Sequence, residues 1–161
     1  RVQVRGRKNN RIKFTKGKDR SKSRMTRREC REHLMILLYQ VEFHKLEELD
    51  EQVSNYLGSI IAPKSDDVAY IRNKYHNVLA HMEEIDSILE SASDGWKLKR
   101  MAKVDLSIMR LAVYEMKYDE EIPVSVAINE AVEIAKKYGQ DESPSFVNGV
   151  LAKVAGMIEK G

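Results

Sequence analysis

The stretch of sequence that decides the fold class is residues 122–158, IPVSVAINEAVEIAKKYGQDESPSFVNGVLAKVAGMI. Apolar residues recur in it every three or four positions, which is the period of a helix that buries one face. The first run predicts a helix over residues 124–138, and we expect Gly139 to end it in the left-handed conformation. Ser143 and Pro144 then open a last helix, because proline is well tolerated in a first helical turn.

The same period extends towards the N-terminus. From Met25 onward the pattern is helical, and apolar positions within residues 34–41 and 49–61 predict two helices, the second of which is stopped by Pro63. Residues 65–90 predict either one long helix or two closely joined helices.

The middle of the chain contains a loop and one further helix. Small residues mark the loop at residues 91–96, SASDGW. Asp105 is expected to cap a helix that runs through Met116 and ends near Tyr118. Since no segment alternates with a period of two, the sequence predicts an all-α protein with six or seven helices and no sheet.

Composition favours one folded domain. The chain has 161 residues, 42% hydrophobic and 33% charged, which suits a globular protein better than a disordered one. No apolar run is long enough to span a bilayer, and no apolar segment follows the basic residues at the start as in a signal peptide. The single cysteine, Cys30, requires no oxidising compartment, so a cytoplasmic location is expected.

Charge divides the chain into a basic arm and an acidic body. Residues 1–24 hold eleven Lys or Arg and one Asp, a net charge of +10, which leaves −7 on residues 25–161. With few apolar residues, the arm is expected to be flexible and to attract phosphates without sequence preference. The alternative is that residues 1–24 are an extension that precedes a natural start at Met25.

Residue types that commonly carry out catalysis, such as histidine and cysteine, do not form a recognisable pattern in this sequence. The histidines, His33, His44, His76 and His81, lack the spacing of metal ligands and are interpreted as surface residues. No base is placed beside Cys30, which is interpreted as a packed or idle thiol. There is also no glycine-rich phosphate loop, so we expect no enzyme activity, no metal and no cofactor.

The start of the first predicted helix is rich in arginine. On a helical wheel, one face beside the core stripe carries Arg24, Arg28 and Arg31, followed by Met35 and Tyr39. Arg27 lies nearer the core direction, but far enough ahead of it to reach solvent. Because guanidinium groups match phosphate oxygens and flat rings stack on bases or partners, this face suits RNA. The alternative is an ordinary solvated helix start.

A second candidate for RNA binding lies on the last predicted helix. Phe146 falls outside the apolar stripe of that helix and close to its N-terminus. Free amide groups there favour anions, and an outlying ring could stack on an unpaired base. The alternative is that Phe146 packs against another helix.

Four segments resemble, in order and spacing, those of the NusB family of transcription antitermination proteins. They are RRECREHLMILLYQ, WKLKRMAKVDLSIMRLAVYEM, IPVSVAINEAVEIAKKYG and SFVNGVLAKV, and the likeness covers Met25 to about Ile158. The resemblance implies two small packed helical bundles and a non-catalytic protein. It also implies binding of the single-stranded boxA element of ribosomal RNA transcripts together with the ribosomal protein NusE, within an antitermination complex of RNA polymerase.

The resemblance also implies roles for individual residues. Arg27, Arg28 and Arg31 would face RNA, with Glu142 and Phe146 at a second RNA-facing position. Tyr39 and Asp105 would face NusE. The basic arm has no counterpart in the family pattern.

Two other interpretations stay open at this point. Similar domains resemble the N-terminal part of ribosomal RNA cytosine methyltransferases, although no nucleotide-binding βα pattern follows here. The chain could also be a homodimer that covers the surface at Tyr39 with a second copy of itself.

Overall fold

The computed structural model describes residues 25–60 and 65–158. The predicted basic arm, residues 1–24, lies outside these ranges, and Arg24 lies outside them with it. The flexible arm and its contact with phosphates therefore stay predictions.

The described residues form seven α-helices and two short 3-10 helices, without a strand. In chain order these are α1 (Arg27–Val41), η2 (Leu46–Glu48), α2 (Leu49–Gly58), α3 (Ser65–Ala80), α4 (Met82–Ala92), η3 (Leu98–Arg100), α5 (Lys103–Tyr118), α6 (Val124–Tyr138) and α7 (Ser143–Met157). The prediction of an all-α protein is confirmed.

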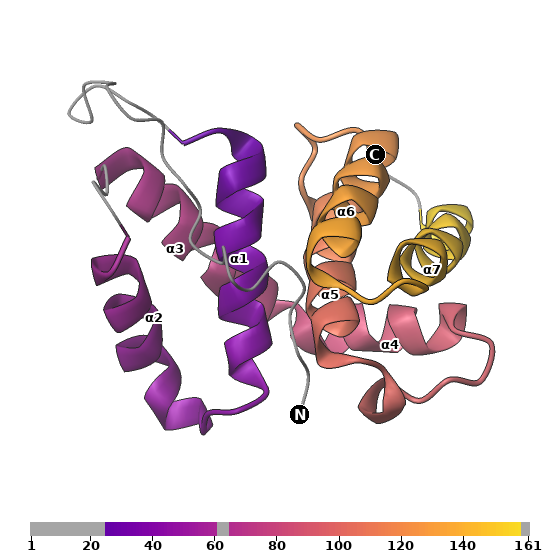
Figure 1. Ribbon diagram of the computed structural model, residues 1–161, viewed down its shortest axis with the longest axis horizontal. Helices are drawn as coiled ribbons and strands as arrows, with labels where there is room; N and C mark the ends of the chain where they lie inside the picture. Colours follow the sequence, from indigo (N-terminus) through magenta and orange to yellow (C-terminus); the bar gives the residue numbers. More distant parts are fainter. Residues whose placement is uncertain (1–24, 61–64, 159–161) are drawn as a thin grey trace.

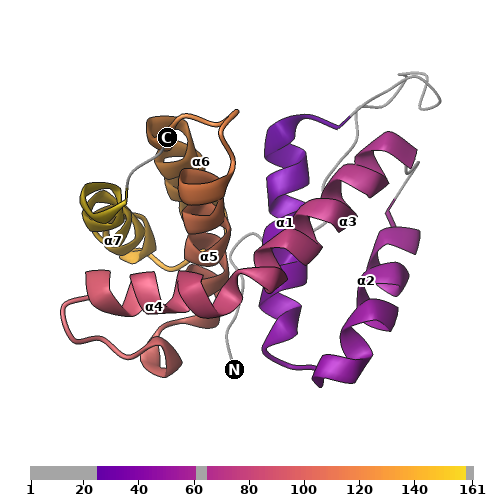
Figure 2. The ribbon, with the colours of Figure 1, turned by 180° about the vertical axis from the view of Figure 1, so that it is seen from behind.

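The helices form two groups that meet along α1 and α5 (Figure 1). Helices α1, α2 and α3 form one group, and α4, α5, α6 and α7 form the other, as the view from behind also shows (Figure 2). Two small packed bundles are therefore present, as the resemblance implied. Because α1 and α5 run in opposite directions, the end of α1 and the start of α5 lie at the same end of the molecule (Figure 1).

Helix α5 is the centre of the fold. Every residue from Val104 to Met116 is buried, because α5 contacts α1, α4, α6 and α7. Such burial on all sides requires partners for the polar members of the helix. Arg110, for example, donates to Asp86 at 2.8 Å and to Glu42 at 2.7 Å, and so joins α5 to α4 and to the end of α1.

Residues 65–92 form two helices, which settles the alternatives left open by the sequence. Helix α3 ends at Ala80 and α4 begins at Met82. His81, between them, has φ −108° and ψ 10°, outside the helical range. Helix α2 ends at Gly58, a few residues before the predicted position.

At two helix ends, the predicted capping residue or backbone conformation is wrong. Asp105 does not cap α5, which begins at Lys103 after Ala102 and has no side-chain cap. Gly139 is not left-handed, since its φ is −84° and its ψ −170°. Glycine is needed there for a close approach: a Cβ would lie 2.5 Å from Cβ of Ser143 and 2.8 Å from the carbonyl oxygen of Ala135.

Within the described ranges, none of the helices combines the length and apolar character that a membrane crossing needs.

Candidate nucleic-acid interface

A capping box fixes the start of α1. The hydroxyl of Thr26 accepts a hydrogen bond from the Glu29 N–H at 3.0 Å, and the Glu29 carboxylate accepts one from the Thr26 N–H at 2.8 Å. This reciprocal pair satisfies two N–H groups that a helix start leaves free. Arg27 and Arg28 follow directly and are both exposed. The box therefore sets the direction in which these two arginines leave the helix.

The two exposed arginines have different partners. The guanidinium of Arg27 lies over the ring of Tyr70 on α3, 3.9 Å from its centroid. Arg28 reaches α6, where its Nε and Nη2 donate to the two carboxylate oxygens of Glu130 at 2.9 and 2.7 Å. These hydrogen bonds raise the pKa of Arg28 and lower the pKa of Glu130. Even so, the Arg28 side chain is 54% exposed, so its outer edge remains accessible.

Arg31 does not lie on the exposed face that the helical wheel indicated. Its side chain is 8% exposed, and its Nε donates to both carboxylate oxygens of Glu115 on α5, at 3.0 and 3.1 Å. Met35, on the same face, is buried as well. The wheel was wrong about exposure because α1 is enclosed by both α3 and α5, so that two of its faces are interior.

Arg31 belongs to a buried ion cluster that joins both bundles. Glu115 also accepts from Nζ of Lys74 on α3 at 2.5 Å, and Lys74 reaches Asp119 at 3.2 Å. Burial lowers the pKa of Lys74, but the charge and hydrogen bond of Glu115 outweigh it, and the net change is upward. Glu130 lies 3.7 Å from Nη1 of Arg31 and so connects the cluster to Arg28. We call these residues the α1 ion cluster: Arg28, Arg31, Lys74, Glu115, Asp119 and Glu130.

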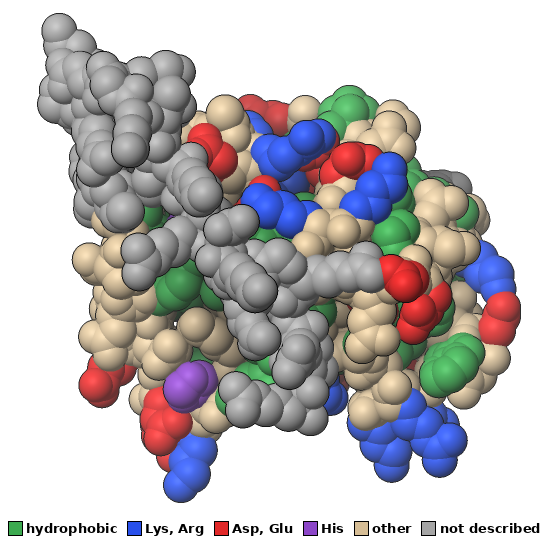
Figure 3. Space-filling model, viewed as in Figure 1, with side chains coloured by type: hydrophobic (Ala, Val, Ile, Leu, Met, Phe, Trp, Pro, Cys, Tyr) green, Lys and Arg blue, Asp and Glu red, His purple; other side chains and the backbone are tan. Residues whose placement is uncertain are grey.

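The surface around this cluster mixes both signs of charge. Figure 3 shows Lys and Arg side chains between the adjoining parts of α1 and α6, with Asp and Glu beside them. Lower on α6, Nζ of Lys137 and the hydroxyl of Tyr138 both donate to Glu32 of α1, at 2.8 and 2.6 Å. The α1–α6 contact is therefore rich in charge but largely paired.

Glu142 and Phe146 lie at the start of α7. Glu142 is the exposed residue that precedes the helix, and its side chain makes no capping hydrogen bond. Phe146 is half-buried and contacts the ring of Trp96 edge-on, with centroids 6.3 Å apart. The alternative that Phe146 packs holds, since its ring lies against Trp96 and the core, while its contact with a base stays a prediction.

Tyr39 lies near the end of α1 in an apolar group. Its ring packs against Phe43 with centroids 5.1 Å apart. Phe43 is exposed, and Leu46 on η2 is 83% exposed. Exposed large apolar side chains so close in sequence are compatible with a protein-binding surface.

Asp105 is at the same end of the molecule as Tyr39, but its side chain is buried. Its Oδ1 has no hydrogen-bond partner among the described residues. Burial raises the pKa of Asp105, while the hydroxyl of Ser143 on α7 acts in the opposite direction. The carboxylate therefore faces the start of α7 more than solvent.

The residues considered for catalysis are scattered. Cys30 is fully buried, and burial raises its pKa to about 11, as a packed thiol requires. His33 is not the surface residue that the sequence suggested: it is buried against Tyr56, and burial lowers its pKa to about 4. Among the described residues, no group of three or more His, Cys, Asp or Glu side chains could hold a metal ion.

Sequence reasoning missed two residues that shape this surface. Glu130 holds Arg28, and a carboxylate on a distant helix gave no signal of that contact. Trp96 contacts Phe146, and its signal was available: an aromatic residue in a glycine-containing loop, followed by Lys97, Lys99 and Arg100.

Fold and surface together define a class: all-helical proteins of two small bundles, with exposed arginines at a capped helix start and half-buried aromatic rings on other parts of the surface. The particular family follows from comparison with known proteins. The chain belongs to the NusB family, whose profile matches residues 28–156.

Relatives and solved structures agree on the family and the fold. The chain is 55% identical over 130 residues to the transcription antitermination protein NusB of Lachnoclostridium phytofermentans, covering 81% of this chain and 98% of that protein. The structure of T. maritima NusB has a TM-score of 0.73 at 30% identity, covering 84% of this chain and 94% of the other. A crystal structure of the antitermination factors NusB and NusE in complex with dsRNA contains a chain of the same fold, with a TM-score of 0.70 at 24% identity, covering 81% and 96%.

Proposed function

We propose that this protein is a non-catalytic transcription antitermination factor. It binds the single-stranded boxA element of ribosomal RNA transcripts together with NusE, in the cytoplasm, as part of an RNA polymerase antitermination complex. The observation that carries the proposal is the capped start of α1, which presents Arg27 and Arg28 to solvent in a chain of the NusB family.

Electrostatics support a division of work between the protein and its partner. Residues 25–161 have a net charge of −7, so RNA is attracted only where positive charge is concentrated locally or supplied by another chain. Arg27 and Arg28 supply the local charge and contact phosphates. Arg31, also predicted to face RNA, is buried and acts indirectly. It pairs with Glu115 and Glu130, and its pairing with Glu130 sets where Arg28 lies.

The second RNA contact is at the start of α7. Phe146 offers the open side of its ring to an unpaired base, and the N–H groups of the first turn favour a phosphate. Glu142 lies beside these N–H groups. Its carboxylate favours groups that can donate a hydrogen bond to it, such as the amino group of a base. Specificity for single strands follows, because stacked bases in a duplex do not offer their faces.

NusE is proposed to bind at the opposite end of α1, on the apolar group of Tyr39, Phe43 and Leu46. Desolvation of such exposed rings and aliphatic side chains is the usual source of interface stability. Asp105 lies at this end, but its carboxylate is buried, so a direct contact with NusE stays a prediction. The monomer and the homodimer differ in whether a second copy covers this surface; sedimentation with and without NusE distinguishes them.

The test is a gel-shift titration of boxA RNA at fixed salt, with NusE present. Arg28→Glu and Arg27→Glu are each expected to weaken binding at least tenfold, because a lost phosphate contact is replaced by repulsion. The matched control is Arg72→Glu on α3, which makes the same charge change at a residue that faces Ser54 on α2. Equal affinity of all three variants and the original protein would refute the proposal.

A further inference from the structure

The loop between α4 and η3 exposes the only tryptophan of the chain, Trp96. Its side chain is among the few large apolar ones that are exposed, at 55%, whereas the aromatic residues Tyr75 and Tyr138 are fully buried. A single exposed ring is common, but this indole adjoins the half-buried ring of Phe146, and adjoining apolar side chains of this kind are found at binding surfaces. No role for it follows from the arginines of α1.

The backbone before Trp96 forms a tight turn. Asp94 and Gly95 both have positive φ, 50° and 86°, which turns the chain sharply after α4. The backbone N–H of Trp96 donates to the Ser93 carbonyl at 3.0 Å, and the Ser93 hydroxyl donates to the carbonyl of Leu89. Asp94 is also paired with Lys153 on α7. The ring is therefore presented by a constrained turn.

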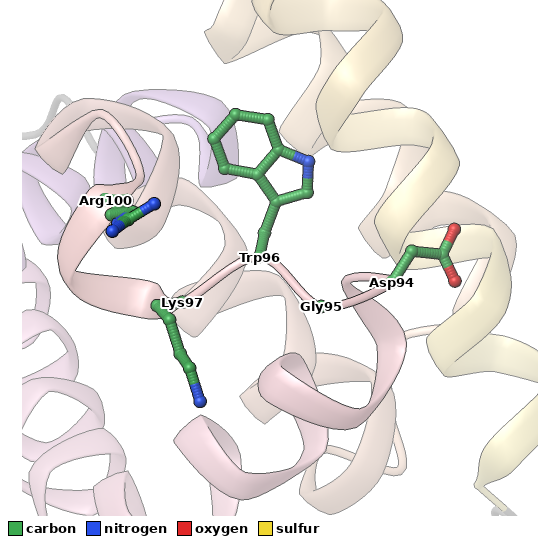
Figure 4. A pocket seen from close by; sticks show the side chains of 5 residues that line it. All are labelled: Asp94, Gly95, Trp96, Lys97 and Arg100. Carbon is green, nitrogen blue, oxygen red and sulfur yellow. The ribbon is translucent and has the colours of Figure 1, made fainter.

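Two shallow hollows adjoin the indole. The first, of about 250 Å³, is lined by Asp94, Gly95, Trp96, Lys97 and Arg100; Figure 4 shows them along the loop, with the indole and the Lys97 side chain pointing to opposite sides. The second, of about 240 Å³, lies between Trp96 and α7, where Phe146, Gly149 and Lys153 line it. Both are smaller than the ~300–1,000 Å³ clefts that enclose a drug-sized ligand. They fit a flat ring laid against the indole better than an enclosed cofactor.

The rim of the first hollow is positively charged. Lys97, Lys99 and Arg100 are all exposed, and within the described part of the chain none of them forms an ion pair. In Figure 3 a group of Lys and Arg side chains lies over the η3 segment at the lower edge of the molecule. Flat aromatic rings with unpaired cations beside them are what a single strand of nucleic acid requires, since bases stack and phosphates are neutralised.

We propose that Trp96 is a second base-stacking position, beyond Phe146, for the same RNA strand. One unpaired base lies against the indole, and Lys97 and Arg100 contact the phosphates that flank it. The edge-on contact with Phe146 places the two rings side by side, so that successive bases of one strand can use both. This inference rests on the proposed function, because it extends the RNA path from α7 to the loop before η3.

The structure offers a way to fill the second hollow without disturbing the fold. A Cβ at Gly149 would meet nothing within 4 Å, and the same is true of Gly156 on the same helix. Only Gly149 lines the hollow beside Trp96. Gly149→Leu should block the hollow, whereas Gly156→Leu makes the same change outside it and is the matched control.

The first measurement is the affinity for boxA RNA in the presence of NusE. Trp96→Ala is expected to weaken binding about tenfold, as loss of a stacked base does, while Trp96→Phe keeps part of the affinity. Gly149→Leu should weaken binding severalfold, and Gly156→Leu should leave it unchanged. Circular dichroism checks that each variant keeps its helices.

The second measurement uses Trp96 as its own probe. Single-stranded boxA RNA added to the chain should quench the tryptophan emission, and a duplex of the same length should quench it much less. Unchanged affinity of Trp96→Ala, while Arg28→Glu still loses binding, would overturn this inference and leave the proposed function intact. An emission change caused by NusE alone would assign the loop to the protein partner and overturn it as well. Failure of the original protein to bind boxA RNA at all would instead remove the proposed function.

Discussion

The start of α1 and the loop before η3 each combine cations with an aromatic ring, but they treat the charges differently. At α1, Arg28 and Arg31 are held by Glu130 and Glu115 in the α1 ion cluster. In the loop, Lys97 and Arg100 have no carboxylate partner among the described residues. Of these two regions, the one that the sequence analysis singled out for its arginines is thus the more neutralised.

The difference shows that burial decides whether an arginine pairs with a carboxylate inside the fold or stays available to a ligand. Helix α1 belongs to one bundle and packs against α5 of the other, so an inward arginine becomes a structural cation that requires a buried carboxylate. The loop lies at the edge of one bundle, where lysine and arginine stay hydrated and free to meet phosphates. The predictions below test whether the α1 cations serve the fold and the loop cations serve RNA.

The largest effect is expected when the α1 ion cluster loses its central carboxylate. Glu115→Gln removes the nearest counter-charge of the buried Arg31 and Lys74 and leaves only the more distant Glu130 and Asp119, which should lower the free energy of unfolding by about 3–5 kcal/mol. Urea denaturation followed by circular dichroism measures it. Glu133→Gln, which removes a carboxylate from the exposed pair with Lys136, is the control and should cost less than about 1 kcal/mol. Similar losses for both variants would mean that the cluster is not a structural unit.

Asp105 offers the opposite case, a buried carboxylate without a cation. Because its pKa is raised in the folded state, its contribution to stability is complete below the unfolded pKa and is lost as the pH rises through the folded pKa. Asp105→Asn should therefore raise the free energy of unfolding at pH 7 by about 1 kcal/mol. At pH 4 the gain should largely disappear. Urea denaturation at both pH values measures the difference, and a variant less stable than the original protein at pH 7 would contradict the assignment.

The fold could be predicted from the sequence because each helix carries its own signal. The apolar period, Pro144 in the first turn and Gly139 after a helix are all local signals. The predicted ends of α6 and the start of α7 therefore agree with the structure, although the predicted backbone conformation of Gly139 does not. Gly139 illustrates the limit. The sequence shows that a glycine ends α6, but only the packing shows that Ser143 leaves no room for a Cβ.

The site was less predictable because exposure depends on distant helices. A helical wheel gives one core direction, whereas α1 has neighbours on two sides, and Arg31 was therefore placed in solvent when it is buried. Glu130, 102 residues from Arg28, could be paired with it only after α1 and α6 were brought together. By contrast, the sequence shows Trp96 between a glycine and several basic residues. Only the exposure of the ring had to come from the structure before Trp96 could be considered as a binding residue.

A smaller effect should follow when Arg28 is released from Glu130. Glu130→Gln keeps the side-chain shape but removes the charge that competes with phosphate for this arginine. Because partly exposed pairs are worth about 0–1 kcal/mol, affinity for boxA RNA with NusE should rise up to about fivefold. Glu133→Gln on the same helix removes an equal charge without touching Arg28, so it should raise affinity less. An equal rise in both variants would mean that only net charge matters.

The smallest effect is expected in the loop, where Asp94→Asn removes the one carboxylate that lines both hollows beside Trp96. Asparagine accepts the left-handed backbone that Asp94 adopts, so the turn should persist and the melting temperature should change by less than about 2 °C. Lys153 then loses its partner and becomes available to the RNA strand, which should raise the affinity for boxA RNA about twofold.

The control for this last change is Glu90→Gln, which removes the same charge from an exposed position on α4 outside both hollows. Gel-shift titration at low and at physiological salt measures the two variants together. A local effect should separate Asp94→Asn from Glu90→Gln at both salt concentrations, because screening weakens distant charges more than adjacent ones. If the two variants bind boxA RNA with equal affinity, the loop cations do not contact the strand. The two basic regions then differ only in how their side chains are packed.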